Sequence, residues 1–367
     1  MATEPFCREC RFYHAPSRIY DLHNDILHEI LSYLPLSALA QLQRTSAHFA
    51  VLLAVKTHDS VDNLLQSFGL GNSEASSIAT TANLEAHDEY DGAEDELTAN
   101  TAVDFMETLR DCSSILVGLA PLRVLFPGIP QQRRLEIFCS WTDQYMVEAL
   151  EERGYRKKEV LERCQVFKVL GYERNFGNPN TIGSACVMAK TVGEGDRKEI
   201  LLVGCKGVTP VSLLTESPCT LLMTFISGEG LYCLYPRLAS DSSGYFNLPD
   251  DDYVAWPGDI PVVNTLRDAG FLIEDAVEKI VAGHRCMVCS SCPSSIRTFP
   301  SPSDFAIEFN IVPHWKSMDT RSLASTIWRL KSCWTCPGLS QLMGFHSEIL
   351  PGAKIQGVKT RIPYIFS

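Results

Sequence analysis

Hydrophobic residues recur at helical spacing near the start of the chain, from about Leu22 to Leu34. The stripe consists of Leu22, Ile26, Leu27, Ile30, Leu31 and Leu34. The spacing predicts an amphipathic helix whose apolar face must be buried. Pro35 ends this helix, because the residue before a proline is displaced from the helical conformation. Two shorter helices are expected next, one capped by Ser37 and one by Ser46.

These three helices make a unit of roughly forty residues, which buries little surface alone and usually needs a partner. Its centre reads Ile30-Leu31-Ser32-Tyr33-Leu34-Pro35-Leu36, followed by Leu39, Leu42, Thr45-Ser46, Phe49 and Leu52-Leu53 at regular intervals. Residues 18–56 therefore resemble an F-box. A generic amphipathic helical hairpin is the alternative.

The resemblance implies a function. An F-box docks to a Skp-type adaptor, so the chain would be the substrate-receptor subunit of a Skp–cullin–F-box ubiquitin ligase. Residues 101–367 would bind the protein substrate, and no catalysis would occur on this chain. The expected adaptor-binding residues are Leu22, Ile26, Leu27, Ile30, Leu31, Leu34, Pro35, Leu39, Leu42 and Phe49.

Residues 57–100 are strongly acidic. No Lys or Arg occurs between Lys56 and Arg110, and the twelve carboxylates there equal the formal net charge of −12. The rest of the chain is near neutral, which disfavours nucleic-acid binding. From about residue 71 the segment has almost no large apolar side chain, so we expect a disordered linker. An acidic docking strip or a phosphorylation-regulated segment is the alternative.

The remaining chain alternates between helical and strand-like patterns. Helices are expected at 101–120, 131–153, 156–170, 265–283 and 322–331, and strands at 185–192, 199–205, 219–227, 231–235 and 305–312. Residues 227–230 predict a hairpin turn between two strands. No internal repeat is visible. The expected fold class is α+β: a three-helix F-box followed by a mixed domain of helices and antiparallel strands.

Cysteine spacing indicates a zinc site. Cys286 and Cys289 form one Cys-x-x-Cys pair, and Cys333 and Cys336 form another. Two such pairs can place four thiolates around one structural Zn²⁺. Cys292 or His284 could substitute for one ligand, and Cys7 and Cys10 form a third pair in the N-terminal tail, residues 1–17. Buried thiols without metal are the alternative.

Motif searches find no phosphate-binding loop, dinucleotide fingerprint, nucleophile elbow or zincin helix. No apolar run approaches the ~20 residues of a membrane span, and the N-terminus lacks the features of a secretory signal. We therefore expect an intracellular protein of the cytoplasm or nucleus, without membrane contact and without enzymatic activity. Two alternatives remain: an enzyme of unknown chemistry in residues 150–367, and a zinc-stabilised interaction scaffold.

Overall fold

The computed structural model describes most of the chain between residues 22 and 274 and short pieces beyond it. The described residues are 22–34, 36–71, 105–140, 143–172, 179–192, 195–247, 260–274, 295, 297–299, 305–309, 326–328 and 330. The N-terminal tail, nearly all of the acidic linker predicted from residue 71 and both C-terminal Cys-x-x-Cys pairs lie outside these ranges.

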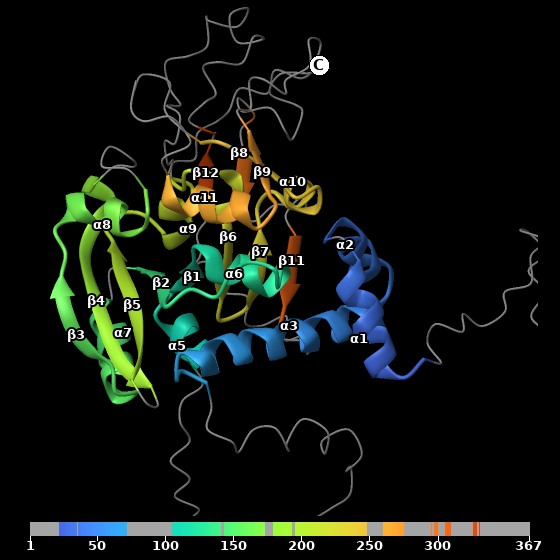
Figure 1. Ribbon diagram of the computed structural model, residues 1–367, viewed down its shortest axis with the longest axis horizontal. Helices are drawn as coiled ribbons and strands as arrows, with labels where there is room; N and C mark the ends of the chain where they lie inside the picture. Colours follow the sequence, from blue (N-terminus) through green and yellow to red (C-terminus); the bar gives the residue numbers. More distant parts are fainter. Residues whose placement is uncertain are drawn as a thin grey trace, which may run out of the picture.

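Three helices open the described chain: α1 (Asn24–Tyr33), α2 (Leu36–Thr45) and α3 (Ala47–Ser67). Their order matches the sequence prediction, and Ser46 is the N-cap residue of α3 with an extended backbone, as expected. The expected cap of the second helix, Ser37, is wrong, because α2 already begins at Leu36. The predicted F-box boundary at residue 56 falls in the middle of α3. Residues 57–67 are helical, so the assignment of a linker beginning at residue 57 was wrong (Figure 1).

An eight-stranded mixed sheet forms the centre of the molecule, in the order β11-β7-β6-β1-β2-β5-β4-β3. Its strands are β1 (Ile115–Val117), β2 (Arg134–Cys139), β3 (Arg156–Val160), β4 (Ile182–Val192), β5 (Asp196–Cys205), β6 (Thr224–Ser227), β7 (Gly230–Cys233) and β11 (Phe305–Glu308). Neighbours pair antiparallel except β2 and β5, which are parallel. The expectation of purely antiparallel strands is corrected to a mixed sheet.

The predicted hairpin between residues 227 and 230 is confirmed. Ser227 of β6 pairs with Gly230 of β7, so two residues make the turn. Gly228 at its tip packs against α5, where a Cβ atom would lie 2.3 Å from the carbonyl oxygen of Met106. Arg110 of α5 donates a hydrogen bond to the carbonyl oxygen of Gly228 at 2.9 Å. The hairpin tip therefore fits only with a glycine.

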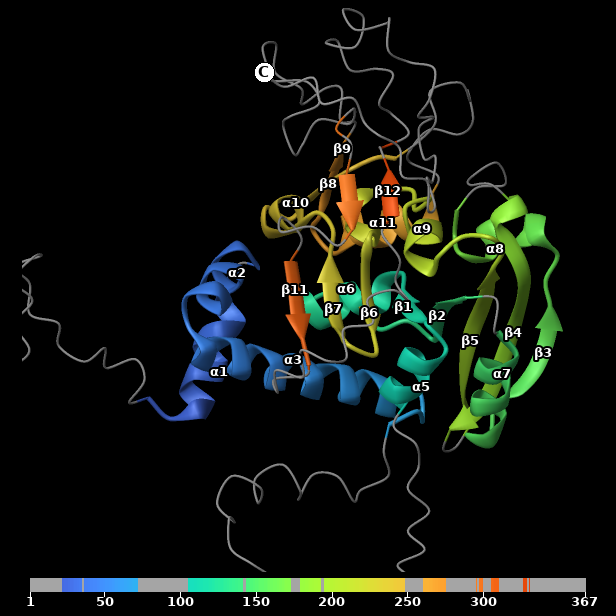
Figure 2. The ribbon, with the colours of Figure 1, turned by 180° about the vertical axis from the view of Figure 1, so that it is seen from behind.

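Shorter elements surround the sheet. The helices are α5 (Phe105–Asp111), α6 (Leu119–Leu125), α7 (Asp143–Glu152), α8 (Arg163–Val169), α9 (Pro210–Leu214), α10 (Pro236–Ser240) and α11 (Pro261–Asp268), with 3-10 turns η2 (Pro179–Thr181) and η3 (Thr220–Leu222). Two small sheets pair β8 (Ser243–Tyr245) with β9 (Leu272–Glu274) and β10 (Arg297–Phe299) with β12 (Thr326–Trp328). Figure 2 shows α3 running below the central sheet toward α5.

All five helices predicted after residue 100 were wrong over part of their length. β1 divides the range 101–120 between α5 and α6. β2 occupies the first part of 131–153, and β3 the first part of 156–170. The helix predicted at 265–283 ends at Asp268 and is followed by β9, and β12 lies inside 322–331. β3 carries Arg, Lys and Glu, which favour helices in isolation. Pairing with β4 overrides that preference.

Two hydrophobic clusters hold the described residues together. The small cluster, within the N-terminal helices, consists of Leu27, Leu31, Phe49, Leu52 and Leu53. The main core fills the sheet region and extends into the second half of α3 through Val61, Leu64, Leu65 and Phe68. Leu36 of α2 also belongs to the main core, and both α2 and α3 contact the edge strand β11. The N-terminal helices are therefore built onto the sheet rather than separated from it by a linker.

Candidate functional site

The outward face of α1 is apolar and exposed. Ile26 is 50% exposed, Ile30 is 38% exposed and Tyr33 is 78% exposed. Their spacing of four and then three residues places these side chains on one side of the helix. We call this set the α1 face. It lies at the end of the molecule farthest from β3, as both ribbon views show.

The opposite side of α1 is closed. Leu27 and Leu31 are buried against Phe49, Leu52 and Leu53 of α3, in the small cluster. The sequence predicted a single buried stripe, but α3 covers only part of its width. The stripe is therefore divided between an inner row that builds the unit and an outer row that remains accessible.

This division separates the ten residues predicted to bind an adaptor. Ile26 and Ile30 lie on the accessible face, whereas Leu27, Leu31 and Phe49 are interior and support the fold. Leu22, Leu34, Leu39 and Leu42 are half-buried against the small cluster, and Pro35 lies outside the described residues. Tyr33 was not among these ten residues, but it lies on the accessible face, seven residues after Ile26.

Two polar contacts supplement the packing of α1. The hydroxyl of Tyr33 donates a hydrogen bond to Oε1 of Glu29 at 2.8 Å, and this contact raises the pKa of the tyrosine. Nζ of Lys56, on α3, donates to the carbonyl oxygen of His28 at 2.8 Å. Burial lowers the pKa of Lys56. The tyrosine ring is thus presented in one orientation, and α1 is tied to α3.

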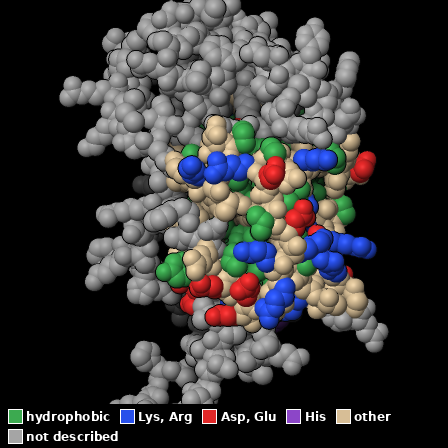
Figure 3. Space-filling model, turned by 90° about the vertical axis from the view of Figure 1, so that its left-hand side faces the viewer, with side chains coloured by type: hydrophobic (Ala, Val, Ile, Leu, Met, Phe, Trp, Pro, Cys, Tyr) green, Lys and Arg blue, Asp and Glu red, His purple; other side chains and the backbone are tan. Residues whose placement is uncertain are grey.

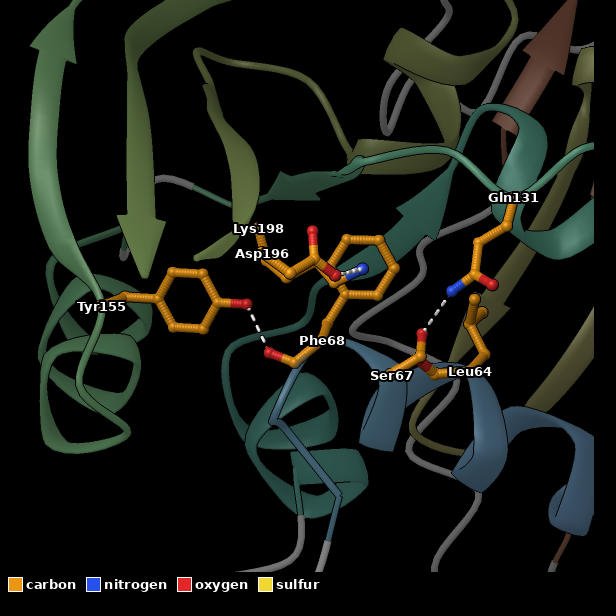
Figure 4. A network of polar contacts seen from close by, with 7 residues as sticks. All are labelled: Leu64, Ser67, Phe68, Gln131, Tyr155, Asp196 and Lys198. Atoms are coloured by element: carbon orange, nitrogen blue, oxygen red, sulfur yellow. Dashed lines mark hydrogen bonds and ion pairs between the residues drawn. The ribbon is translucent and has the colours of Figure 1, made fainter. Parts of the chain in front are cut away.

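The C-terminal end of α3 is anchored in the sheet region (Figure 4). The hydroxyl of Tyr155 donates a hydrogen bond to the carbonyl oxygen of Phe68 at 2.6 Å, in a buried position. The ring of Phe68 lies 5.4 Å from Nζ of Lys198, whose charge is paired with Asp196 at 2.8 Å. One residue earlier, Oγ of Ser67 accepts a hydrogen bond from the amide of Gln131 at 2.8 Å. These contacts hold α3, and with it the α1 face, in a fixed position relative to the sheet.

The proposed zinc ligands Cys286, Cys289, Cys333 and Cys336 lie outside the described residues, as do Cys7 and Cys10. Within the described ranges, no group of three or more His, Cys, Asp or Glu side chains could hold a metal ion. The zinc site therefore stays a prediction.

Seven cysteines lie among the described residues. Six are buried: Cys112, Cys139, Cys186, Cys205, Cys219 and Cys233. Burial raises the pKa of Cys112 and raises that of Cys219 to about 11. A thiol with a raised pKa is a poor nucleophile at neutral pH. These two cysteines therefore act as core residues rather than as reactive groups.

Glu136 is the carboxylate with the most unusual environment. Burial raises its pKa to about 7, against the opposing effect of Arg134, whose Nη2 lies 3.3 Å from Oε1. Its Oε2 lies against Gly118, where a Cβ atom would approach within 2.2 Å. Gly118 has a φ of 76°, a conformation that favours glycine. The carboxyl group thus lies between the backbone at Gly118 and the guanidinium of Arg134, and 16% of the side chain is exposed.

A shallow hollow lies between α3, α6 and β2. Its lining is mostly apolar and consists of Leu64, Phe68, Leu119, Ala120, Arg123, Pro130, Gln132 and Leu135. The one cation in this set, Arg123, has a structural role, since its Nη1 donates a hydrogen bond to the carbonyl oxygen of Ile129 at 2.6 Å. The hollow is a packing feature of the α3 anchor and does not gather catalytic groups.

None of the helices in the described part of the chain is both long enough and apolar enough to span a membrane. In the comparisons with known proteins, no family model, no curated protein and no solved structure matches this chain.

Proposed function

We propose that the α1 face binds a Skp-type adaptor, and that the chain is a substrate receptor of a Skp–cullin–F-box ubiquitin ligase. The observation that carries this proposal is the exposure of Ile26, Ile30 and Tyr33 on a helix whose other side is buried. Exposed apolar side chains that share one face favour an interaction surface. Residues 18–56 resemble an F-box, and this resemblance is the reason for proposing a Skp-type adaptor as the partner.

The anchored α3 supports the same function. A receptor subunit acts by holding its substrate near the transferring enzyme, so the distance between its two binding surfaces must be kept. The contacts of Ser67 and Phe68 with Gln131 and Tyr155 join the N-terminal helices directly to the sheet. In this proposal, residues from 105 onward hold the protein substrate and the ligase chemistry takes place on other subunits.

Capture of a purified Skp-type adaptor by the full-length chain tests the proposal. Ile26 and Ile30 are 50% and 38% exposed, so burying the rest of either side chain should contribute about 1 kcal/mol, and an Asp there would also place an unpaired charge against an apolar partner. Ile26→Asp and Ile30→Asp should therefore each weaken capture by tenfold or more. Tyr145→Asp is the matched control, because Tyr145 is also a large exposed side chain, at 67%, but lies on α7.

The outcomes separate the alternatives. An adaptor-binding F-box requires capture by the wild type and by Tyr145→Asp, with loss in both isoleucine variants. A zinc-stabilised scaffold or an enzyme predicts no capture by any of the four proteins. Equal capture by all four proteins would mean that the adaptor binds elsewhere on the chain. It would refute the proposal that the α1 face is the adaptor-binding surface.

A further inference from the structure

One charged side chain lies within the apolar α1 face. Glu29 is exposed and stands three residues after Ile26 and four residues before Tyr33. Residues three and four apart share one side of a helix, so this carboxylate lies beside both apolar side chains. Its Oε1 accepts the hydrogen bond from the Tyr33 hydroxyl at 2.8 Å. A partner that covers Ile26, Ile30 and Tyr33 therefore comes into contact with the carboxylate as well.

Glu29 has no direct ion pair with another described residue. Lys56 of α3 is close enough to interact with it through space. Nζ of Lys56, however, donates to the carbonyl oxygen of His28 at 2.8 Å, and no ion pair among the described residues includes Glu29. Tyr33 supplies a neutral donor only. While the α1 face is uncovered, the charge of Glu29 is therefore stabilised mainly by water.

A carboxylate at the other end of the molecule is paired within the chain. Figure 3 shows the side that carries β3, where Asp and Glu side chains lie among Lys and Arg side chains. At this end, Oε1 of Glu199 on β5 lies 2.8 Å from Nζ of Lys158 and 3.6 Å from Nε of Arg197. The hydrogen bond from Lys158 and the charges of the nearby cations lower the pKa of Glu199. Glu29 lacks this support, so a pairing cation has to come from outside the described structure.

Covering the α1 face removes the water that stabilises Glu29. A charge that loses its water without gaining a partner opposes binding, because its desolvation is not compensated. A cation on the partner replaces the lost water with a charge-assisted hydrogen bond. A charge pair of this kind also fixes the choice and the orientation of the partner.

We propose that the partner of the α1 face carries a Lys or Arg side chain opposite Glu29, and that the two side chains pair when the complex forms. This pairing rests on the proposed function, since it describes how the α1 face recognises the adaptor. The remaining partner surface is apolar where it covers Ile26, Ile30 and the ring of Tyr33. Glu29 is thus a specificity-determining residue within an apolar contact.

Capture of the purified adaptor by the full-length chain is measured for the wild type, Glu29→Gln and Glu29→Lys. Glu29→Gln removes the charge but keeps an oxygen that can accept from Tyr33. The matched control is Glu148→Lys. Glu148 is an exposed carboxylate on α7, and its Oε1 accepts a hydrogen bond at 3.0 Å from Gln144, four residues away. The control therefore reverses a charge in a similar helical setting outside the α1 face.

Glu29→Lys should weaken capture by about tenfold or more, because it opposes a cation to a cation, and Glu29→Gln should weaken it by about threefold to tenfold. Glu148→Lys should capture the adaptor like the wild type. Raising the salt concentration to about 0.5 M should weaken capture by the wild type and leave Glu29→Gln unchanged, because only the wild type has a charge pair to screen.

Single alanine replacements of the Lys and Arg side chains of the adaptor identify the pairing cation. One replacement should weaken capture by the wild type but not by Glu29→Gln, because the two side chains that interact directly are coupled in a double-mutant cycle. The same replacement should affect the wild type and Glu148→Lys equally. If no basic residue of the adaptor is coupled to Glu29, the pairing is wrong.

Other outcomes separate the pairing from the proposed function. Wild-type capture by Glu29→Lys, together with loss of capture in Ile26→Asp, would overturn the pairing and leave the adaptor surface in place. The pairing would also be overturned if Tyr33→Phe reproduced the loss in Glu29→Gln with an unchanged salt dependence, because Glu29 would then act only by holding the tyrosine ring. A wild-type chain that captures no adaptor would overturn both proposals.

Discussion

The two halves of α3 belong to different cores. The first half contributes Phe49, Leu52 and Leu53 to the small cluster with α1. The second half contributes Val61, Leu64 and Leu65 to the main core, together with the C-cap residue Phe68 that follows it. The first half supports a helix with an exposed apolar face, whereas the second half is anchored by hydrogen bonds from Tyr155 and Gln131. One helix thus joins a surface suited to a partner with a sheet that can carry a substrate.

This comparison predicts unequal effects of the same substitution in the two halves. Phe68→Ala should lower the global free energy of unfolding by about 3 to 5 kcal/mol, because it opens a cavity in the main core. Phe49→Ala should instead loosen α1 and α2, since small cooperative units can open separately. Chemical denaturation measures the first effect, and amide hydrogen exchange in α1 measures the second. Equal losses of global stability in both variants would mean that the two clusters form one cooperative core.

A second prediction assigns a pH dependence to the main core. Burial raises the pKa of Glu136 to about 7, so the folded state binds this proton more tightly than the unfolded state. Its stabilising contribution is complete below the unfolded pKa near 4.5 and is lost as pH rises to 7. The loss amounts to roughly 3 kcal/mol.

Glu136→Gln removes this titration. Between pH 5 and pH 7.5, the wild type should lose unfolding free energy that the variant keeps. The variant should therefore become more stable relative to the wild type as pH rises. Exchange in α1 should keep the same pH dependence in both proteins, because Glu136 lies in β2, away from the small cluster. An unchanged difference across this range would show that Glu136 stays ionised in the folded protein.

The anchor of α3 provides a third prediction. Tyr155→Phe leaves the buried carbonyl oxygen of Phe68 without its donor and should cost about 1 to 3 kcal/mol of stability. Tyr145→Phe is the matched control, because Tyr145 is exposed on α7. Thermal or denaturant unfolding of both variants measures the cost. If the Tyr155 variant were as stable as its control, the hydrogen bond to Phe68 would not contribute to holding α3 in place.

The smallest effect on stability is expected at the α1 face. Ile30→Asp should lower the free energy of unfolding by about 1 kcal/mol, because 38% of the side chain is already exposed and only the rest is packed. The same substitution should weaken adaptor capture. A large loss of stability would instead identify Ile30 as a core residue and would make its effect on capture uninformative.

Much of the helical and strand content could be predicted from local patterns. The helices α1 and α2, the start of α3, the strands β4, β5 and β7 and the β6–β7 hairpin followed from apolar periodicity and turn residues. β3 could not, because Arg156, Lys157 and Lys158 favour a helix until β4 supplies backbone partners. The continuation of α3 was readable in Val61, Leu64, Leu65 and Phe68, which repeat at helical spacing after the predicted boundary.

For the α1 face, the sequence predicted only that a stripe of apolar residues runs along the helix. The sequence identifies Ile26, Leu27, Ile30 and Leu31 as apolar, but which pair faces the solvent depends on where α3 crosses α1. That crossing is a tertiary property and leaves no periodic signal. The exposure of Tyr33 is decided in the same way, since its spacing from Ile26 places it on the stripe but does not say whether the ring is buried.

Oxidative footprinting of Tyr33 tests the central claim most directly. In the free chain, Tyr33 is 78% exposed and Tyr145 is 67% exposed, so both rings should be modified at comparable rates. After addition of a saturating Skp-type adaptor, we expect Tyr33 to become protected by about tenfold or more, while Tyr145 keeps its rate. Equal modification of Tyr33 with and without adaptor, in a sample in which the adaptor is bound, would contradict the assignment of the α1 face as the adaptor-binding surface.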